Sequence, residues 1–394
     1  DLGYISFGYR SIDADQDIFQ CVVEGEGVIN DAALQSAIRR VAEAIPACQS
    51  VLRGGFRTRY WSAQGPLPDV RTLHRDWDGH YREDLEFLER SFDLVAGPVG
   101  EIVQVVSHKT FLVFRMHHAV MDGMAMSDFV RAFFKALRHE PLEKMYSTYT
   151  LENLVDTKIR QKLLPSLLRA VNPLGDRPLP SGSRPRQREW RRVQVNVNDR
   201  WALPEVAVAL AQLAREVEPG PVRFSLPVNL RRHAPEEKTS ANLVGILSVD
   251  IDENETARTF VKKVNAMLKE ELELPSEKEL KGSHVFKKLP LPLLRYIGKL
   301  MLFLVFRSKH FRTSGTLSSM GKTALAQFSC DHFVARTFFA ISISPTGSPL
   351  FAVISSNDHV TEITLSATRA MAAGNRLQQL AEHLAARLAK SGPI

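Results

Sequence analysis

Apolar residues change their spacing abruptly at one place in this chain. From Thr110 to Met116 the sequence is rich in apolar, β-branched and aromatic residues, which predicts a buried strand. After Asp122 the apolar positions recur at helical spacing: Met126, Phe129, Val130, Phe133, Phe134 and Leu137. His117, His118, Asp122 and Gly123 lie between the two patterns. Because Asp122 suits a helix cap and Gly123 gives a turn backbone freedom, we expect a strand–loop–helix joint that exposes side chains on a rigid support.

The same reasoning predicts a mixed α/β order in the rest of the chain. We expect strands at residues 17–24, 192–197, 222–230, 243–250, 337–344, 350–355 and 362–366, and helices at 32–45, 151–171, 203–216 and 375–390. The strands at 337–344 and 350–355 are expected to form a hairpin. Prolines and basic residues interrupt the middle of the chain, which predicts three parts: an N-terminal subdomain (1–140), a crossover or linker (141–190) and a C-terminal subdomain (191–394).

The histidine pair indicates proton transfer. An imidazole with a pKa near neutrality is well suited to take a proton from a hydroxyl or amine. Gly123, at a helix start with unpaired N–H groups, is a candidate oxyanion donor. An isolated histidine pair is more often a surface pair, or one core and one exposed residue, but the joint and the Asp-Gly spacing favour catalysis here. A metal site is disfavoured, because adjacent residues at a strand end can hardly ligate one ion and the sequence has no HExxH or CxxC partner.

Two segments carry a resemblance to a known superfamily. Residues 117–123 read HHAVMDG, which is HHxxxDG, and residues 91–98 read SFDLVAGP, which resembles the FDLxxGP segment that precedes HHxxxDG in that superfamily. The chain therefore resembles chloramphenicol acetyltransferase and its relatives, which include condensation domains of nonribosomal peptide synthetases, wax ester synthases and polyketide-associated acyltransferases. The resemblance implies an α/β fold of two chloramphenicol-acetyltransferase-like subdomains with the active site at their interface.

The resemblance also implies roles for residues of the motif. His118 would be the general base, with His117 beside it and Gly123 at the oxyanion. Asp122 would be structural, paired with an arginine rather than with the base. Arg231, which follows the expected strand at 222–230, is the candidate partner, with Arg232 as the alternative.

Three further residues match weaker landmarks of the superfamily. Asn242 matches a segment that lines the channel near the active site in relatives. Ser318 and Ser319 match a segment whose hydroxyl groups could polarise the thioester or hold the oxygen of the intermediate. Turns that need asparagine or small residues explain all three residues equally well.

Composition limits the class of protein. The 394 residues are 44% hydrophobic and 24% charged, which suffices for two substantial cores. Three cysteines that lie far apart argue against a disulfide framework and for a reducing compartment. The chain as given opens without a signal-peptide pattern, and no stretch approaches the roughly 18 uninterrupted apolar residues of a membrane span. We therefore expect a soluble, cytoplasmic monomer.

Net charge is +7 with a sequence pI near 9.3, and the basic excess concentrates in residues 184–192 and 285–312. Neither segment has a helix-turn-helix, zinc-finger or RNP-type pattern, so nucleic acid is not the expected partner. The phosphates of coenzyme A, or an acidic carrier protein, would account for the charge, and solvated surface is the alternative. Residues 285–312 combine bases with a dense apolar face. This is typical of a basic helix at a membrane surface or a lipid-like substrate, and equally of an ordinary core helix.

We therefore expect an acyltransferase that moves an acyl group from a thioester to an acceptor hydroxyl, in lipid or secondary-metabolite biosynthesis. The co-substrate would be acyl-CoA or a phosphopantetheinyl carrier protein, the acceptor a small-molecule or lipid-like alcohol, with no metal and no permanently bound cofactor. Two alternatives stay open. One is a freestanding condensation-type enzyme that forms an amide or ester from carrier-bound substrates, and the other is a non-catalytic docking domain.

Overall fold

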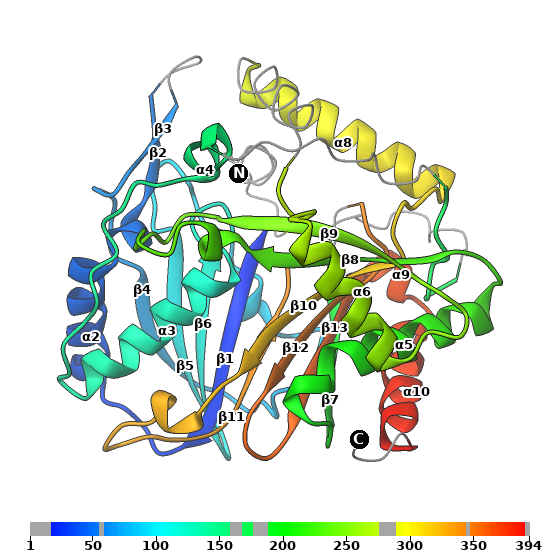
Figure 1. The fold of residues 1–394 in the computed structure, drawn as a ribbon. Coiled ribbons are helices and arrows are strands. Elements are labelled where there is room, and N and C mark those ends of the chain that lie inside the picture. Colours follow the sequence, from blue (N-terminus) through cyan, green and yellow to red (C-terminus); the bar gives the residue numbers. More distant parts are fainter. Residues whose placement is uncertain are drawn as a thin grey trace.

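Two β-sheets that stand side by side form the centre of the molecule (Figure 1). The computed structural model describes residues 17–54, 59–157, 168–175, 188–275, 289–343 and 347–390. The first sheet has five strands, the second has six, and helices cover both. This arrangement confirms the α/β class expected from the sequence.

The first sheet contains the strand that ends at the histidine pair. In spatial order its strands are β11 (Val334–Ile341), β1 (Ile18–Glu26), β6 (Thr110–His117), β5 (Gly100–Val106) and β4 (Asp69–His74). Neighbouring strands are antiparallel except β5 and β4, which are parallel. The first half of the chain adds helices α2 (Asp31–Ala44), α3 (Gly123–Leu137) and α4 (Leu151–Thr157), the 3₁₀ turns η1 (Pro46–Gln49) and η2 (Glu86–Leu88), and a hairpin of β2 (Val51–Arg53) and β3 (Tyr60–Ser62).

The aromatic face of α3 holds this helix against the first sheet. Phe129, Phe133 and Phe134 are buried, and the ring of Phe114 on β6 lies 5.2 Å from that of Phe133 between centroids. Truncating one such ring to alanine costs about 3–5 kcal/mol of stability. Strand and helix are thus fixed to each other by packing, which holds the loop between them at both ends.

The second sheet is built from the C-terminal half of the chain. In spatial order its strands are β7 (Arg188–Val195), β13 (Thr361–Thr368), β12 (Phe351–Ser356), β10 (Gly315–Lys322), β8 (Val222–Asn229) and β9 (Val244–Ile251). The helical elements of this half are α5 (Asp199–Val217), α6 (Ala257–Lys269), α8 (Leu291–Ser308), α9 (Arg369–Ala372), α10 (Arg376–Lys390), η3 (Leu230–His233) and η4 (Leu325–Phe328). Helices α5 and α10 pack together against this sheet, and α6 packs on α5 (Figure 1).

Two sequence-based predictions about elements are wrong. The expected hairpin of residues 337–344 and 350–355 does not form, because β11 joins the first sheet and β12 the second. Most residues of both strands are buried, so alternation of polar and apolar residues could not assign them to one sheet. The helix expected at 151–171 is described as α4 over Leu151–Thr157, and its predicted end at residue 171 is wrong. Residues 168–171 are not helical, and 158–167 lie outside the described residues.

β11 also affects the expected subdomains. This strand comes from the C-terminal half of the chain, yet it is part of the N-terminal sheet. The chain therefore links the two sheets covalently through β11. The boundaries at residues 140 and 190 stay a prediction.

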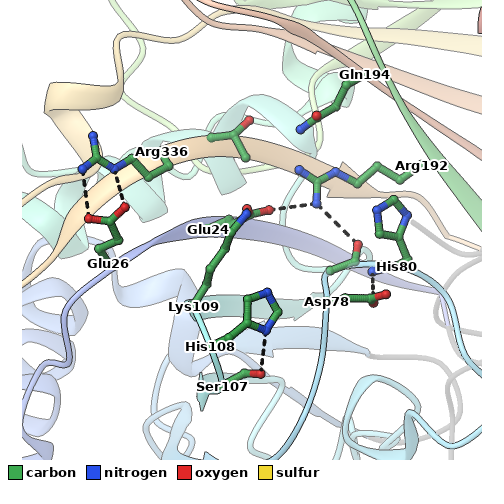
Figure 2. A network of polar contacts seen from close by, with 12 residues as sticks. Glu24, Glu26, Asp78, His80, Ser107, His108, Lys109, Arg192, Gln194 and Arg336 are labelled. Carbon is green, nitrogen blue, oxygen red and sulfur yellow. Dashed lines mark hydrogen bonds and ion pairs between the residues drawn. The ribbon is translucent and has the colours of Figure 1, made fainter.

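A buried arginine joins residues of strands in the two sheets. Nη1 of Arg192, on β7, donates to Oε2 of Glu24 on β1 at 2.9 Å, and its Nη2 donates to Oε1 of Glu362 on β13 at 2.8 Å. Figure 2 shows the contact with Glu24 close to the exposed ion pair of Arg336 and Glu26. The charge of Arg192 is therefore balanced by carboxylates from both sheets.

This network corrects the expectation for the basic cluster at 184–192. Arg192 is buried, Arg188 donates to two main-chain carbonyl oxygens, and Arg191 pairs with Glu189 at 2.6 Å. Their partners come from inside the protein, so the described part of the cluster does not form a basic surface for the donor. The first four residues of the cluster lie outside the described residues.

Helix α8 runs along the outside of the molecule rather than between the sheets (Figure 1). Leu294 is part of the hydrophobic core beside the first sheet, and Val305 packs against the hydrophobic core beside the second sheet. In the part of the chain that the structure describes, no helix has the length and apolar character needed to cross a membrane.

Candidate active site

The histidine pair lies where the middle strand of the first sheet ends. His117 is the last residue of β6 and pairs with Ile18 of β1. His118 follows in the loop and donates its main-chain N–H to the carbonyl oxygen of Asp17 at 2.7 Å. Helix α3 begins at Gly123. The strand–loop–helix joint predicted from the sequence is therefore present.

Asp122 is a fully buried carboxylate that binds at both of its oxygens. Oδ1 accepts the N–H of Ala125 at 2.9 Å, which caps α3. Oδ2 accepts from Nη1 of Arg231 at 2.8 Å and from the N–H of Leu243 at 2.9 Å. The expected ion pair of Asp122 and Arg231 is thus present. These bonds tie the carboxylate to the start of α3 and to the second half of the chain.

Arg231 lies in η3, directly after β8, and holds a loop of the second half in place. Its Nε donates to the carbonyl oxygen of Thr239 at 3.2 Å, and its Nη2 donates to that of Ala241 at 2.8 Å. Its Nη1 is shared between Asp122 and the side chain of Asn229, at 3.3 Å from the latter. One guanidinium therefore positions the loop before β9 against the histidine loop.

Asn242 forms a second contact across the interface. Its Nδ2 donates to the main-chain carbonyl oxygen of His118 at 2.9 Å. The next residue, Leu243, is the one whose N–H binds Asp122. Two consecutive residues of the second half thus hold His118 and Asp122. The sequence explained Asn242 equally well as a turn residue, and the structure gives it a defined partner.

The His118 ring lies in the wall of a cavity between the sheets. Its Nδ1 is buried, and the ring of Phe19 meets it edge-on at 6.0 Å between centroids. Burial lowers the pKa of His118, and a hydrogen bond with its own main chain, together with the charge of Asp122, opposes this only in part. The imidazole is therefore neutral at pH 7 and able to accept a proton.

His117 is placed differently from its neighbour. It is fully buried, its Nδ1 accepts the N–H of Ala119 at 3.2 Å, and its own N–H donates to the carbonyl oxygen of Val99 at 2.9 Å. It is not among the residues that line the cavity. The geometry gives His117 a part in shaping the loop, and its expected part in the reaction stays a prediction.

The cavity has a volume of about 350 Å³ and takes its wall from both halves of the chain. His118 and Gly123 come from the first half, whereas Asn242 and Ser318 come from the second. Sequence reasoning missed the apolar part of the wall, which consists of Phe19, Leu151, Pro227, Val244, Ile246, Ile343 and Phe351. These residues come from several separate elements, so no local pattern could have gathered them.

Strand β10 shows which of the two candidate serines faces the cavity. Ser318 lines it, and so does Thr316, two residues earlier on the same face of the strand. Ser319 is exposed, and its Oγ accepts the N–H of Gly321 at 3.2 Å. Because successive side chains of a strand alternate, Ser319 cannot share the cavity with Ser318. The same alternation would have identified Thr316 from the sequence.

The three cysteines are not set up as nucleophiles. Burial raises the pKa of all three cysteines, that of Cys48 to about 12, so none of them is a ready thiolate. Within the described residues, no group of three or more His, Cys, Asp or Glu side chains could hold a metal ion.

The two sheets with a cavity between them define a known class of fold, that of the condensation domains. The starter condensation domain of rhizomide synthetase RzmA, a mutant in complex with C8-CoA, matches with a TM-score of 0.63 and 13% identity, over 96% of this chain and 90% of that one. The condensation domain of the Monacolin K polyketide synthase MokA matches with a TM-score of 0.61 and 10% identity, over 99% and 95%.

A third solved structure is polyketide synthase associated protein 5 from Mycobacterium tuberculosis, with a TM-score of 0.59 and 14% identity, over 95% of this chain and 94% of that one. Comparisons with protein-family models and with curated proteins found no match. The structural matches confirm the fold that the sequence resemblance implied: two chloramphenicol-acetyltransferase-like subdomains in one chain.

Proposed function

We propose that this protein is an acyltransferase that moves an acyl group from a thioester to an acceptor hydroxyl, with His118 as general base. The main support for the proposal is the position of the His118 ring in the wall of a cavity that is built from both sheets, where burial lowers the pKa of the ring. A general base contributes when it sits at the reacting proton and is neutral at the working pH.

The reaction follows from the positions of the groups. As the acceptor oxygen attacks the thioester carbonyl, its proton passes to the imidazole of His118, whose ring lines the cavity. The tetrahedral intermediate then breaks its C–S bond, and the departing thiolate takes the proton back from the imidazolium. Gly123, at the start of α3, and Ser318 are the candidate donors to the oxyanion.

His118 is held for this task by its surroundings. Asn242 fixes the carbonyl of His118, and the ion pair of Asp122 and Arg231 fixes the loop that follows. We assign Asn242, Asp122 and Arg231 as positioning residues. Substrate specificity would come from the apolar wall of the cavity.

The co-substrate would be acyl-CoA or an acyl group on a phosphopantetheinyl carrier protein. The presence of C8-CoA in the RzmA domain supports an acyl thioester as donor. The predominantly apolar wall suits an acyl chain and a small-molecule or lipid-like alcohol. On this proposal the protein works as a cytoplasmic monomer in lipid or secondary-metabolite biosynthesis and needs no metal or permanently bound cofactor.

The structural likeness to condensation domains favours a second candidate function. A freestanding condensation-type enzyme would join two carrier-bound substrates through an amide or an ester, with the same base. It differs from the first candidate in the acceptor, which would be an amine or hydroxyl on a carrier protein rather than a free alcohol. A non-catalytic docking domain is the third outcome, in which His118 would have no reaction to catalyse.

A thiol-release assay separates these candidates. The protein is incubated with a panel of acyl-CoA and acyl-carrier thioesters, with and without alcohols and amines, and free thiol is measured together with product mass. We expect release that depends on an alcohol and is lost in His118→Ala but not in His383→Ala, which removes an exposed histidine on α10. Release only with carrier-bound acceptors would favour the condensation enzyme. No release with any pair would favour the docking domain.

A further inference from the structure

Helix α8 exposes large apolar side chains over most of its length. Tyr296, Leu300, Met301, Phe303 and Leu304 are each 46–67% exposed, and Leu293 is 42% exposed. At 100° per residue these six side chains occupy one side of the helix. This corrects the view of the segment as an ordinary core helix, since its apolar side faces outward.

Another side of the same helix attaches it to the protein. Leu294 is buried in the core of the first half, and Val305 packs against the core of the second half. The main chain adds contacts near both ends, where Leu289 accepts a hydrogen bond from Arg59 and Lys309 accepts one from Arg169. The helix is therefore held in one orientation, and the exposed apolar side is a fixed feature.

Charge is distributed unevenly along the sequence. Between Glu279 and Asp331 the sequence contains nine Lys or Arg and no Asp or Glu. The rest of the chain therefore has a net charge of −2, although the whole chain has +7. Arg307 and Arg312 are exposed at the C-terminal end of the helix. The whole basic excess of the protein thus belongs to the segment that contains the exposed apolar side.

We propose that α8 binds the surface of an anionic lipid bilayer, lying parallel to it with its exposed side among the lipid headgroups. A helix with large apolar side chains on one side and basic residues near it buries that side about 5–10 Å into the headgroup and acyl boundary. Each lysine or arginine near an anionic surface strengthens binding about fivefold. An 18-residue helix is about 27 Å long, so all six side chains can reach one flat surface together.

The shape of the surface favours lipid over a protein partner. The six side chains stand on a convex helix at the outside of the molecule, whereas a protein partner would need a groove matching it. Soluble monomers rarely expose an apolar surface of this kind. The proposal does not depend on the proposed function, because none of the six side chains lines the active-site cavity.

Sedimentation with vesicles tests this proposal. The whole protein is mixed with vesicles of phosphatidylcholine alone or of phosphatidylcholine with phosphatidylserine. We expect binding to the mixed vesicles that weakens with added salt and with Arg307→Glu. The triple variant Tyr296→Ser, Leu300→Ser, Phe303→Ser should bind at least tenfold more weakly. The matched controls are Val217→Ser, an exposed apolar residue on α5, and Arg258→Glu, an exposed base on α6.

Three results would overturn the proposal. One is equal sedimentation with and without vesicles. Another is binding by the triple variant that matches the wild type. The third is a concentration-dependent dimer that the triple variant abolishes, which would assign the surface to a second copy of the chain. An unchanged thermal midpoint and unchanged activity on water-soluble thioesters show that the triple variant is folded, and Leu300→Ser alone replaces it if it is not.

Discussion

Two arginines join the two halves of this protein, and they differ in what they hold. Arg231 reaches Asp122 and two main-chain carbonyl oxygens, and all of these groups belong to the loops around His118. Arg192 reaches Glu24 and Glu362, which lie within strands of the two sheets. Both contacts bring an arginine and carboxylates out of water, which is favourable only when the charges are well paired.

The difference lies in the neighbourhood of each arginine. The Arg231 contact borders the cavity, so a shift there moves the loop that presents His118. The Arg192 contact is surrounded by packed side chains, with the guanidinium 4.0 Å from the centre of the Phe339 ring. We infer that the first contact serves the geometry of the reaction and the second the stability of the two sheets. Five measurements test this difference between the two contacts.

The largest expected effect is at the base itself. His118→Ala removes the proton acceptor, and general-base catalysis typically contributes about 10²–10⁴-fold in rate. We expect turnover to fall by that factor with an unchanged thermal midpoint, because His118 is partly open to the cavity and forms no part of either arginine contact. Turnover and unfolding are measured beside His383→Ala. A variant that kept near-normal turnover would remove His118 from the mechanism.

The Arg192 contact should affect stability alone. Arg192→Met leaves Glu24 and Glu362 buried without their main partner, and breaking a buried pair in this way costs about 3–5 kcal/mol. Chemical denaturation gives the free energy of unfolding, and activity per folded molecule should stay within about twofold of the wild type. The control is Arg336→Met in the exposed pair with Glu26, which should leave the unfolding midpoint unchanged. A large loss of activity per folded molecule in Arg192→Met would contradict the comparison.

The Arg231 contact should affect both properties at once. Asp122→Asn places an amide where Oδ2 accepts from Arg231 and Leu243, so donors face donors. We expect a loss of about 1–3 kcal/mol in the free energy of unfolding. Turnover should fall as well, because the histidine loop loses its anchor. A loss of activity with full stability would instead indicate that Asp122 takes part directly in the chemistry.

A smaller effect is expected at Asn242. Asn242→Ala removes one hydrogen bond to the carbonyl of His118, worth about 0.5–1.5 kcal/mol. If that bond positions the base, the loss should appear in kcat, at up to about tenfold, with little change in KM. Asn242→Asp should not rescue it, because a carboxylate cannot donate to a carbonyl oxygen. An increase in KM alone would mean that Asn242 contacts the substrate.

The two arginines also show how far the sequence can be interpreted. The joint at residues 117–123 was predictable, because the change from strand to helix spacing and the polar loop lie in one short stretch. Arg231 was reached by resemblance, since nothing local connects it with Asp122. The role of Arg192 was predicted wrongly. A run of basic residues predicts an exposed surface. The two carboxylates that pair with the buried Arg192 lie 168 and 170 residues away in the sequence.

The helices give the same lesson. Both α3 and α8 have helical apolar spacing, yet α3 packs its apolar side inward and α8 exposes it. Spacing shows that a helix has an apolar side, and it does not show which way that side faces. The apolar wall of the cavity could not be predicted from the sequence either, because its residues meet only once the two sheets are in place.

The smallest effect is expected from a change in pH, which should affect activity and stability in different pH ranges. Burial lowers the pKa of His118, so its activity as a base falls only when the pH drops below about 6.5, the ordinary value. The unfolded chain binds more protons there, so stability also declines slightly as the pH falls through that range.

For Glu24, burial works to raise the pKa, but Arg192 and Lys109 outweigh it and hold the pKa below its usual value. That stabilisation is complete above about pH 4.3 and is lost as the pH falls through the folded-state pKa. Profiles of kcat/KM and of thermal midpoint against pH should therefore show activity declining first, with the main loss of stability at lower pH. A midpoint that collapsed together with activity between pH 7 and pH 5 would contradict the separation of the two regions.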